Sequence, residues 1–273
     1  MNYRWFKFND IVIGRHSHYL LSDVQGINDG AITRKETTYI KTDGGKISDV
    51  YFDMRHFSIT GHILTNALEI AEKRRRKLIA ACTPKKPFTI TYFNGVNKFS
   101  AVCYTDDLPV FTKLNKSNYR FVINITIPGF FWEDMKTRSK YVSIKEDMVH
   151  DAFILPMVFT KMYNFADIIN YGDVETEPVI TVTSLAQSEE NTVTIYNQTT
   201  GKSIGINYIL SEGEVITFDH ANGNITSNIN GNVVNSLIKT SEFWSLEQGK
   251  NVVSCPNGNV QVMVKYKSLY VGV

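Results

Sequence analysis

Residues 201–205 have the order Gly-Lys-Ser-Ile-Gly and so match G-x-S-x-G, the motif that holds the nucleophilic serine of many hydrolases. In those enzymes a strand enters a sharp turn and a helix follows, whose amide groups help to form the oxyanion hole. Here apolar residues alternate after the motif, at Ile204, Ile206 and Tyr208. Because alternation is typical of a strand, we predict a β-hairpin in which Ser203 has no catalytic role.

Three other groups of polar residues are candidates for a site, and each has a simpler structural interpretation. The end of the motif resembles a P-loop, but Tyr196 occupies the position of the first glycine. His16 and His18 would face one side of a strand, yet no third metal ligand lies nearby in the sequence. The pairs at 106–107 (Asp-Asp) and 189–190 (Glu-Glu) adjoin turns, and neighbouring strand residues point to opposite faces. We therefore predict no catalytic residue, no bound metal and no cofactor.

The three cysteines, Cys82, Cys103 and Cys255, are too few and too far apart for a disulfide framework or a zinc site. They are typical of a reducing compartment, where thiols act as small apolar core residues. Charges interrupt the N-terminal residues, and no apolar run reaches the ~18 residues needed to cross a membrane. We expect synthesis and folding in a cytoplasm, without membrane insertion.

Composition places the chain among ordinary globular proteins. Its 273 residues are 43% hydrophobic and 21% charged, which excludes a disordered or fibrous protein. At about 150 residues per domain, this length predicts two domains. The formal net charge of +2 argues against a general nucleic-acid-binding or polybasic membrane-binding protein. Aromatic residues make up 12% of the chain and, with many Val, Ile and Thr residues, favour β structure.

Alternating apolar residues between turn signals predict a mainly β fold with two β-sandwich-type domains. Asn-Gly pairs favour the tight turns of hairpins and occur at 94–95, 222–223, 230–231 and 257–258. The segment 62–82 instead has apolar residues at helical spacing, and Pro84 follows it. We predict a first domain at 1–134, in which this single helix covers a sheet. Residues 133–169 are polar and irregular in pattern and would lead into a second β domain at 135–273.

A basic run, Lys-Arg-Arg-Arg-Lys, occupies positions 73–77 of the predicted helix. Five successive residues surround a helix axis, so these charges cannot form one stripe. One interpretation is that the side chains extend over the core with their charges in solvent. The other is that Arg74, Arg75 and Arg76 lie at a subunit boundary or in a lumen, against an acidic partner or phosphate groups. The sequence leaves both interpretations open.

The order of segments in the second half resembles the distal tail protein family of long-tailed bacteriophages, the siphophage tail-component family. The segments that carry this resemblance are 170–178, the strand 179–182, the hairpin 192–208, 211–219, 243–251, 264–266 and 270–273. The first half is compatible, with Asp53-Met54-Arg55 before the helix and the strand 121–127 ending in Pro-Gly-Phe. The resemblance covers nearly the whole chain and is strongest from Asn170 onward.

The resemblance implies a structural protein of the virion, not an enzyme. Such proteins form a hexameric ring at the distal end of the tail, a hub that connects the tail tube to the tail tip or baseplate. The first domain surrounds the DNA channel, and a galectin-like second domain projects outward and holds receptor-binding parts. The last segment, 262–273, would return to complete the first domain. The protein would be made and assembled in the host cytoplasm and would reside at the tail tip.

The partners implied by the resemblance are further copies of the chain, the major tail tube protein, tail-tip proteins and receptor-binding proteins. DNA would pass through the ring without specific binding. Closing such a ring requires two different patches on each subunit, because the contact is head-to-tail. Exposed strand edges can supply such patches through main-chain hydrogen bonds.

A galectin-like domain raises a second functional hypothesis, a carbohydrate-binding accessory module. Galectins bind β-galactosides through a signature resembling H-x-N-x-R followed by W-x-x-E-x-R. His220 and Asn222 match the first part, and Trp244 and Glu247 match the second, but asparagine and glycine replace the two arginines. Because guanidinium groups would hold the sugar hydroxyls, we expect these four residues to be at most a remnant of a sugar site.

Overall fold

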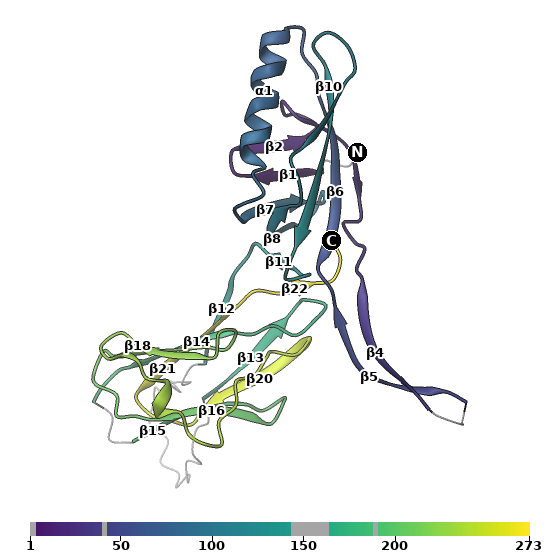
Figure 1. Cartoon of the computed structure of the whole chain (residues 1–273). Helices are drawn as coiled ribbons and strands as arrows, with labels where there is room; N and C mark the ends of the chain where they lie inside the picture. The colour runs from purple at the N-terminus through teal and green to yellow at the C-terminus, as the bar shows by residue number, and fades with distance from the viewer. Residues whose placement is uncertain (1–3, 40–42, 143–163, 188–190) are drawn as a thin grey trace, which may run out of the picture. The chain divides into compact units, whose positions relative to one another are not determined.

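The computed structural model describes residues 4–39, 43–142, 164–187 and 191–273 (Figure 1). The chain divides into two compact units. Unit 1 contains Met1–Met135 and Tyr270–Val273, and unit 2 contains Lys136–Leu269. The mainly β fold predicted from the sequence is confirmed, and the described residues include a single α-helix.

Unit 1 contains most of the first half of the chain. Its elements are β1 (Trp5–Phe8), β2 (Ile11–Gly14), β3 (Leu20–Gln25), β4 (Ile32–Thr38), β5 (Gly45–Phe52), β6 (Arg55–Ile63), α1 (Leu68–Ala81), β7 (Phe88–Phe93), β8 (Lys98–Thr105), β9 (Val110–Lys113), β10 (Tyr119–Ile127) and β11 (Trp132–Asp134). The main sheet has the order β2-β1-β7-β8-β10-β6-β3, with β9 paired to β10 and β11 paired to β8. Strands β4 and β5 form a separate two-stranded sheet.

The core of unit 1 follows from the alternation of its strands. Along β6 and β10 every second side chain is buried, so Phe57 and Phe121 belong to one apolar cluster. Fully buried Trp132 lies among aromatic rings of this cluster, with its ring centroid 5.9 Å from that of Phe57 and 6.0 Å from that of Tyr92. Such a cluster stabilises the sheet because large aromatic side chains bury the most apolar area.

Helix α1 is shorter than the predicted helix 62–82. His62 and Ile63 continue β6, where they pair with Arg120 and Tyr119 of β10, and the backbone is still extended at Ala67 (φ −118°, ψ 127°). The sheet thus holds the first residues of the predicted helix, since strand pairing there overrides the helical spacing. Of the predicted apolar stripe, Ala71, Leu78 and Cys82 are buried, whereas Leu64 and Leu68 are exposed.

Unit 2 is a sandwich of two antiparallel sheets. Its strands are β12 (Arg138–Val142), β13 (Asn164–Asn170), β14 (Val179–Ser184), β15 (Thr192–Asn197), β16 (Lys202–Asn207), β17 (Val215–Asp219), β18 (Asn224–Ser227), β19 (Gly231–Asn232), β20 (Gly249–Cys255) and β21 (Val260–Tyr266). One sheet has the order β12-β21-β14-β17-β18-β19 and the other β13-β20-β15-β16. Both sheets contribute buried residues to one core, including Ile180 and Phe218 from the first and Ile195 and Ile204 from the second.

The structure differs from the sequence prediction in the extents of two segments, 262–273 and 133–169. The predicted domain boundary lies one residue from the observed division, but only the last four residues of 262–273 belong to unit 1. Strand β21 remains in unit 2 because it pairs with β12 and β14, and the short β22 (Leu269–Tyr270) spans the division. The segment 133–169 is not irregular throughout: it contains β12 and most of β13, while residues 143–163 lie outside the described part of the chain.

A buried carboxylate organises one turn of unit 2. Glu214 is fully buried, and its side chain accepts hydrogen bonds from the Tyr208 hydroxyl (2.7 Å), the Ser211 backbone N–H (3.0 Å) and the Ser227 hydroxyl (2.5 Å). Burial by itself raises the pKa of this carboxyl group, but the hydrogen bonds more than offset that effect, so the pKa lies below its usual value. The charged side chain therefore ties β17 and β18 to the turn before them.

Candidate interaction surfaces

The described residues contain no group of three His, Cys, Asp or Glu side chains that could hold a metal ion. All three cysteines are buried, and burial raises the pKa of Cys82 and of Cys103 to about 12. These thiols are therefore packing residues. No described helix is long and apolar enough to span a membrane. The features of unit 1 that can contact a partner are two surfaces and a hollow beside the second of them.

The G-x-S-x-G segment lies in a hairpin, as predicted. Strand β15 pairs with β16 from Thr192↔Asn207 to Asn197↔Lys202, and Gly201 has the positive φ of 72° that the turn requires. Ser203 is on β16, where its neighbour across the pair is Tyr196. A serine in mid-strand lacks the strained strand-to-helix turn that exposes a nucleophile.

The other polar groups take local roles. His16 and His18 lie in the turn between β2 and β3, not on a strand, because the Ser17 hydroxyl bonds the backbone of Gly14 and Tyr19 and holds the turn. Asp106 accepts a hydrogen bond from the Thr126 hydroxyl at 2.5 Å, so this carboxylate is not simply solvated. The pair 189–190 lies outside the described residues.

The first surface is the β4–β5 hairpin of unit 1, which sequence patterns did not single out. It extends away from the rest of the unit (Figure 1), and all eight residues of β5 are exposed. The register places Val50 opposite Arg34 and, after a register shift between Lys35 and Glu36, Ile47 opposite Glu36. Both aliphatic side chains therefore lie on the face of the hairpin that also carries Arg34 and Glu36. Val50 is 58% exposed and Ile47 is 53% exposed. The opposite face carries the Lys35–Asp49 ion pair, with Nζ and Oδ2 3.5 Å apart, and the exposed Tyr51.

The base of this hairpin is held by a buried arginine. Arg55, at the start of β6, is fully buried and donates hydrogen bonds to the carbonyl oxygens of Phe130 (2.9 Å), Ile27 (2.6 Å) and Val271 (2.5 Å). Its guanidinium also lies 4.2 Å from the centroid of the Phe130 ring, on which Phe52 of β5 stacks at 4.3 Å. Burial lowers the pKa of this guanidinium, and nearby Asp29 opposes the shift. Arg55 thereby joins the hairpin base to the last residues of the chain.

The second surface is the basic run of α1, whose members separate in the structure. Arg74 donates a hydrogen bond from Nη2 to Nδ1 of His18 (3.0 Å). Arg75 turns to another side, where it pairs with Glu72 (3.0 Å) and lies over the Phe111 ring, 5.7 Å from its centroid. Arg76 is exposed. The structure therefore does not bring Arg74, Arg75 and Arg76 together, and their position at a subunit boundary or lumen stays a prediction.

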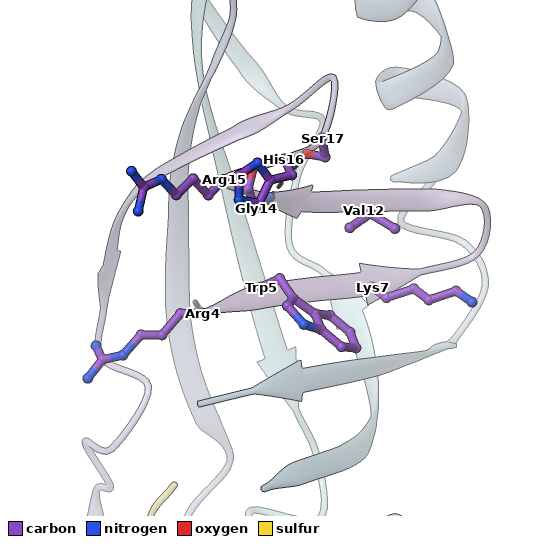
Figure 2. Close-up of a pocket in the computed structure, with 8 residues that line it drawn as sticks. All are labelled: Arg4, Trp5, Lys7, Val12, Gly14, Arg15, His16 and Ser17. Carbon is purple, nitrogen blue, oxygen red and sulfur yellow. Dashed lines mark hydrogen bonds between the residues drawn. The ribbon is translucent and has the colours of Figure 1, made fainter. Parts of the chain in front are cut away.

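Next to α1, the β1–β2 hairpin borders a hollow of about 220 Å³ (Figure 2). Figure 2 shows Trp5 and Lys7 on β1, Arg4 just before this strand, and Arg15 and His16 in the turn that follows β2. The hollow combines an indole ring with several cationic side chains.

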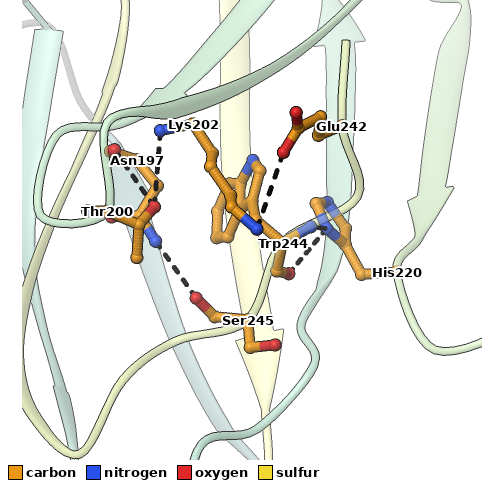
Figure 3. Close-up of polar contacts among 7 residues, drawn as sticks. All are labelled: Asn197, Thr200, Lys202, His220, Glu242, Trp244 and Ser245. Carbon is orange, nitrogen blue, oxygen red and sulfur yellow. Dashed lines mark hydrogen bonds and ion pairs between the residues drawn. The ribbon is translucent and has the colours of Figure 1, made fainter.

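The four residues of the predicted galectin-like remnant do not lie together in the structure. His220 and Trp244 meet, with ring centroids 4.6 Å apart (Figure 3), but both belong to the interior: Trp244 is 2% exposed. Asn222 instead turns toward Asp219, with Nδ2 2.7 Å from Oδ2, and Glu247 is exposed in another loop. An indole that is this deeply buried offers no face for a sugar ring. The four residues do not form a sugar site in this arrangement.

The contacts around Trp244 are structural. The Trp244 backbone N–H lies 3.0 Å from Nδ1 of His220, and burial lowers the pKa of His220 to about 4, although the Trp244 backbone and Asp219 oppose the shift. Lys202 pairs with Glu242 at 3.5 Å on the surface nearby (Figure 3). Among the described residues, His220 Nε2 and Trp244 Nε1 are buried without a hydrogen-bond partner. This cluster fixes the loop before β20 against the sandwich.

Comparison with known protein families identifies both halves of the chain. Residues 9–127 match the phage tail protein RIFT-related domain, and residues 171–270 match the siphovirus-type tail component, C-terminal domain. Together the two matches cover well over half of the chain. The protein therefore belongs to the siphovirus-type tail components, and it is a structural protein of the phage tail. Among curated proteins, no sequence matches it.

Solved structures show the same fold over nearly the whole chain. The SPP1 Dit protein, described as a paradigm of the hub adsorption apparatus in phages that infect Gram-positive bacteria, is 11% identical, with a TM-score of 0.74 over 97% of this chain and 98% of that one. Two structures of the phage P2 baseplate in its activated conformation, with Ca and with Sr, are each 10% identical, with a TM-score of 0.50 over 96% of this chain and 97% of theirs. The chain therefore shares the fold of these proteins.

Proposed function

We propose that this protein is the distal tail hub of a long-tailed phage, a hexameric ring that connects the tail tube to the tail tip or baseplate. Unit 1 builds the ring around the DNA channel, through which DNA passes without specific binding. Unit 2 carries tail-tip or receptor-binding proteins. The family, and a fold shared with SPP1 Dit over nearly the whole chain, support this role. No enzymatic step and no cofactor is part of it, and the protein would reside in the virion tail.

The β4–β5 hairpin carries the proposal. A soluble monomer seldom exposes several large aliphatic side chains together on a projecting element, because contiguous exposed apolar area marks an interaction site. In addition, β4 and β5 pair only with each other among the described strands, so each leaves one edge without a strand partner. Docking this hairpin on a different patch of the next copy gives the head-to-tail contact from which a ring closes.

Substitution of an exposed aliphatic residue of the hairpin tests whether the chain forms a ring through this element. Val50→Asp should convert the oligomer to monomers of 31.1 kDa, because burying a valine contributes about 1.5–3 kcal/mol at each contact and removing the new carboxylate from water costs free energy on association. The measurement is molar mass by light scattering, with the purified chain alone and with the tail tube protein.

Thr37→Asp is the matched control, since Thr37 lies on the other face of the same hairpin, where its neighbour across the strand pair is Lys46. It should leave the mass of the oligomer unchanged. A wild-type chain that stays monomeric at high concentration even with the tube protein would contradict the ring. A ring that survives Val50→Asp would instead place its interface elsewhere in unit 1.

A further inference from the structure

A second hollow, which the ring does not require, lies between α1 and the turn that joins β2 to β3. It has a volume of about 550 Å³ and is open to solvent. Lys73, Arg74 and Lys77 line it from the helix, and His18 lines it from the turn. We call this hollow the α1 groove.

The α1 groove carries an excess of positive charge. Three cationic side chains of α1 face a single carboxylate, that of Asp10, among its lining residues. Arg75 is excluded because it pairs with Glu72 on another side of the helix. Positions 73, 74 and 77 share one side of a helix, because residues four apart lie one above the other. The net charge of the whole chain is only +2, so this concentration of charge is local.

The hydrogen-bond donors of the groove are held in place. Arg74 donates to the Leu64 carbonyl oxygen (3.2 Å) and to Nδ1 of His18 (3.0 Å), and the Tyr19 hydroxyl donates to the Arg74 carbonyl oxygen (3.0 Å). A guanidinium can only donate, so Nδ1 of His18 must accept and the ring hydrogen is on Nε2. The wall therefore presents an oriented N–H beside two flexible ammonium groups, a set suited to carboxylate oxygens.

Apolar side chains complete the groove. Ile70 of α1 is 46% exposed and Val12 of β2 is 38% exposed, and both line it. Val12, His16 and Ser17 also line the smaller hollow beside Trp5 (Figure 2), so the two hollows adjoin at β2 and the turn that follows it. A ligand that fills this surface must combine carboxylates with a large aliphatic or aromatic side chain.

We propose that the α1 groove binds an acidic segment of a partner protein, in which carboxylates flank one large apolar side chain. Nucleic acid fits the surface less well, because the Asp10 carboxylate lines the groove, because Glu69 and Glu72 precede the basic run on the same helix, and because DNA-binding faces are extended and strongly basic. The cationic side chains would hold the carboxylates, and Ile70, Val12 and Trp5 would contact the apolar side chain. This proposal does not depend on ring formation.

Fluorescence anisotropy tests the proposal with the full chain and a fluorescein-labelled Glu-Glu-Leu-Glu-Glu peptide at low salt. We expect binding that weakens at least about tenfold with Lys77→Glu, since a favourable charge contact becomes a repulsive one. The matched control is Arg76→Glu, one residue away on the same helix and outside the groove, which should bind as the wild type does. A Gln-Gln-Leu-Gln-Gln peptide should bind at least about tenfold more weakly than the acidic one.

Several outcomes would overturn the proposal. Equal losses with Lys77→Glu and Arg76→Glu would show a diffuse charge effect without a groove. Equal binding of the glutamine peptide would reduce the site to an apolar contact. Tighter binding of a labelled DNA duplex, lost with Lys77→Glu, would assign the groove to nucleic acid. No binding of the acidic peptide by the wild type would also overturn it, whether or not the ring forms.

Discussion

Arg55→Ala is expected to lower the free energy of unfolding of unit 1 by about 4 kcal/mol. The substitution leaves three carbonyl oxygens, those of Ile27, Phe130 and Val271, without the donor that now reaches them. Hydrogen bonds to a charged group contribute about 1.5–3 kcal/mol each, and a buried acceptor left without a donor costs about 1–3 kcal/mol. The total is smaller than the sum because the chain relaxes around the missing side chain.

Urea unfolding followed by circular dichroism measures the loss, and hydrogen exchange of β6 peptides locates it. The last residues of the chain should lose protection together with the hairpin base, because Arg55 bonds both. Arg120→Ala is the matched control, since Arg120 is an exposed arginine on β10, and it should change the free energy by less than about 0.5 kcal/mol. If Arg55→Ala behaves like Arg120→Ala, the three bonds do not stabilise unit 1.

Unit 2 is expected to lose about 3 kcal/mol of stability as pH falls from about 6.5 to about 4. The pKa of His220 is lowered from 6.5 to about 4 in the folded chain, chiefly by burial. Between these two values the unfolded chain binds a proton that the folded chain does not, so acid favours unfolding. Above about pH 6.5 both states hold a neutral imidazole, and the contribution no longer changes with pH.

The variant His220→Gln isolates this effect, because glutamine does not titrate. Its free energy of unfolding should stay nearly constant between about pH 6.5 and pH 5, whereas that of the wild type should fall. The pKa values of Glu214 and Asp219 are also lowered, but these carboxylates take up protons only at pH values below the interval from pH 6.5 to pH 5. Urea titrations at several pH values, read by tryptophan fluorescence, make the measurement; Trp5 and Trp132 of unit 1 contribute equally in both proteins, so the difference between the two proteins at each pH reports unit 2. Parallel pH profiles for the two proteins would contradict the assignment to His220.

The parts of the fold that local pattern determines could be predicted from the sequence. The β15–β16 hairpin follows from alternation on both sides of Gly201, and the β7–β8 hairpin follows from the turn that contains Gly95. The start of the helix could not be placed, because pairing of His62 with Arg120 extends β6 into the helical pattern. Such pairing joins residues far apart in the sequence and leaves no local signal.

The surfaces were harder to predict, for the same reason. In the sequence, Arg55 is indistinguishable from an ordinary charged surface residue. Its burial depends on carbonyl groups from three distant segments. The basic run gives no indication that Arg75 turns to Glu72 while Arg74 reaches His18. The separation of Asn222 from the buried His220–Trp244 pair likewise requires the folded loops. Motif spacing identified the residues but could not identify their neighbours.

The return of Tyr270–Val273 to unit 1 has a mechanical consequence. The chain leaves unit 1 after Met135 and re-enters it at Tyr270, so unit 2 is an insertion held by two covalent tethers. A pulling force on unit 2 is shared between both tethers, and a protease that cuts one of them does not release the unit. The second tether holds as long as the terminal strand segment stays anchored, and Arg55, through the Val271 carbonyl oxygen, is part of that anchor.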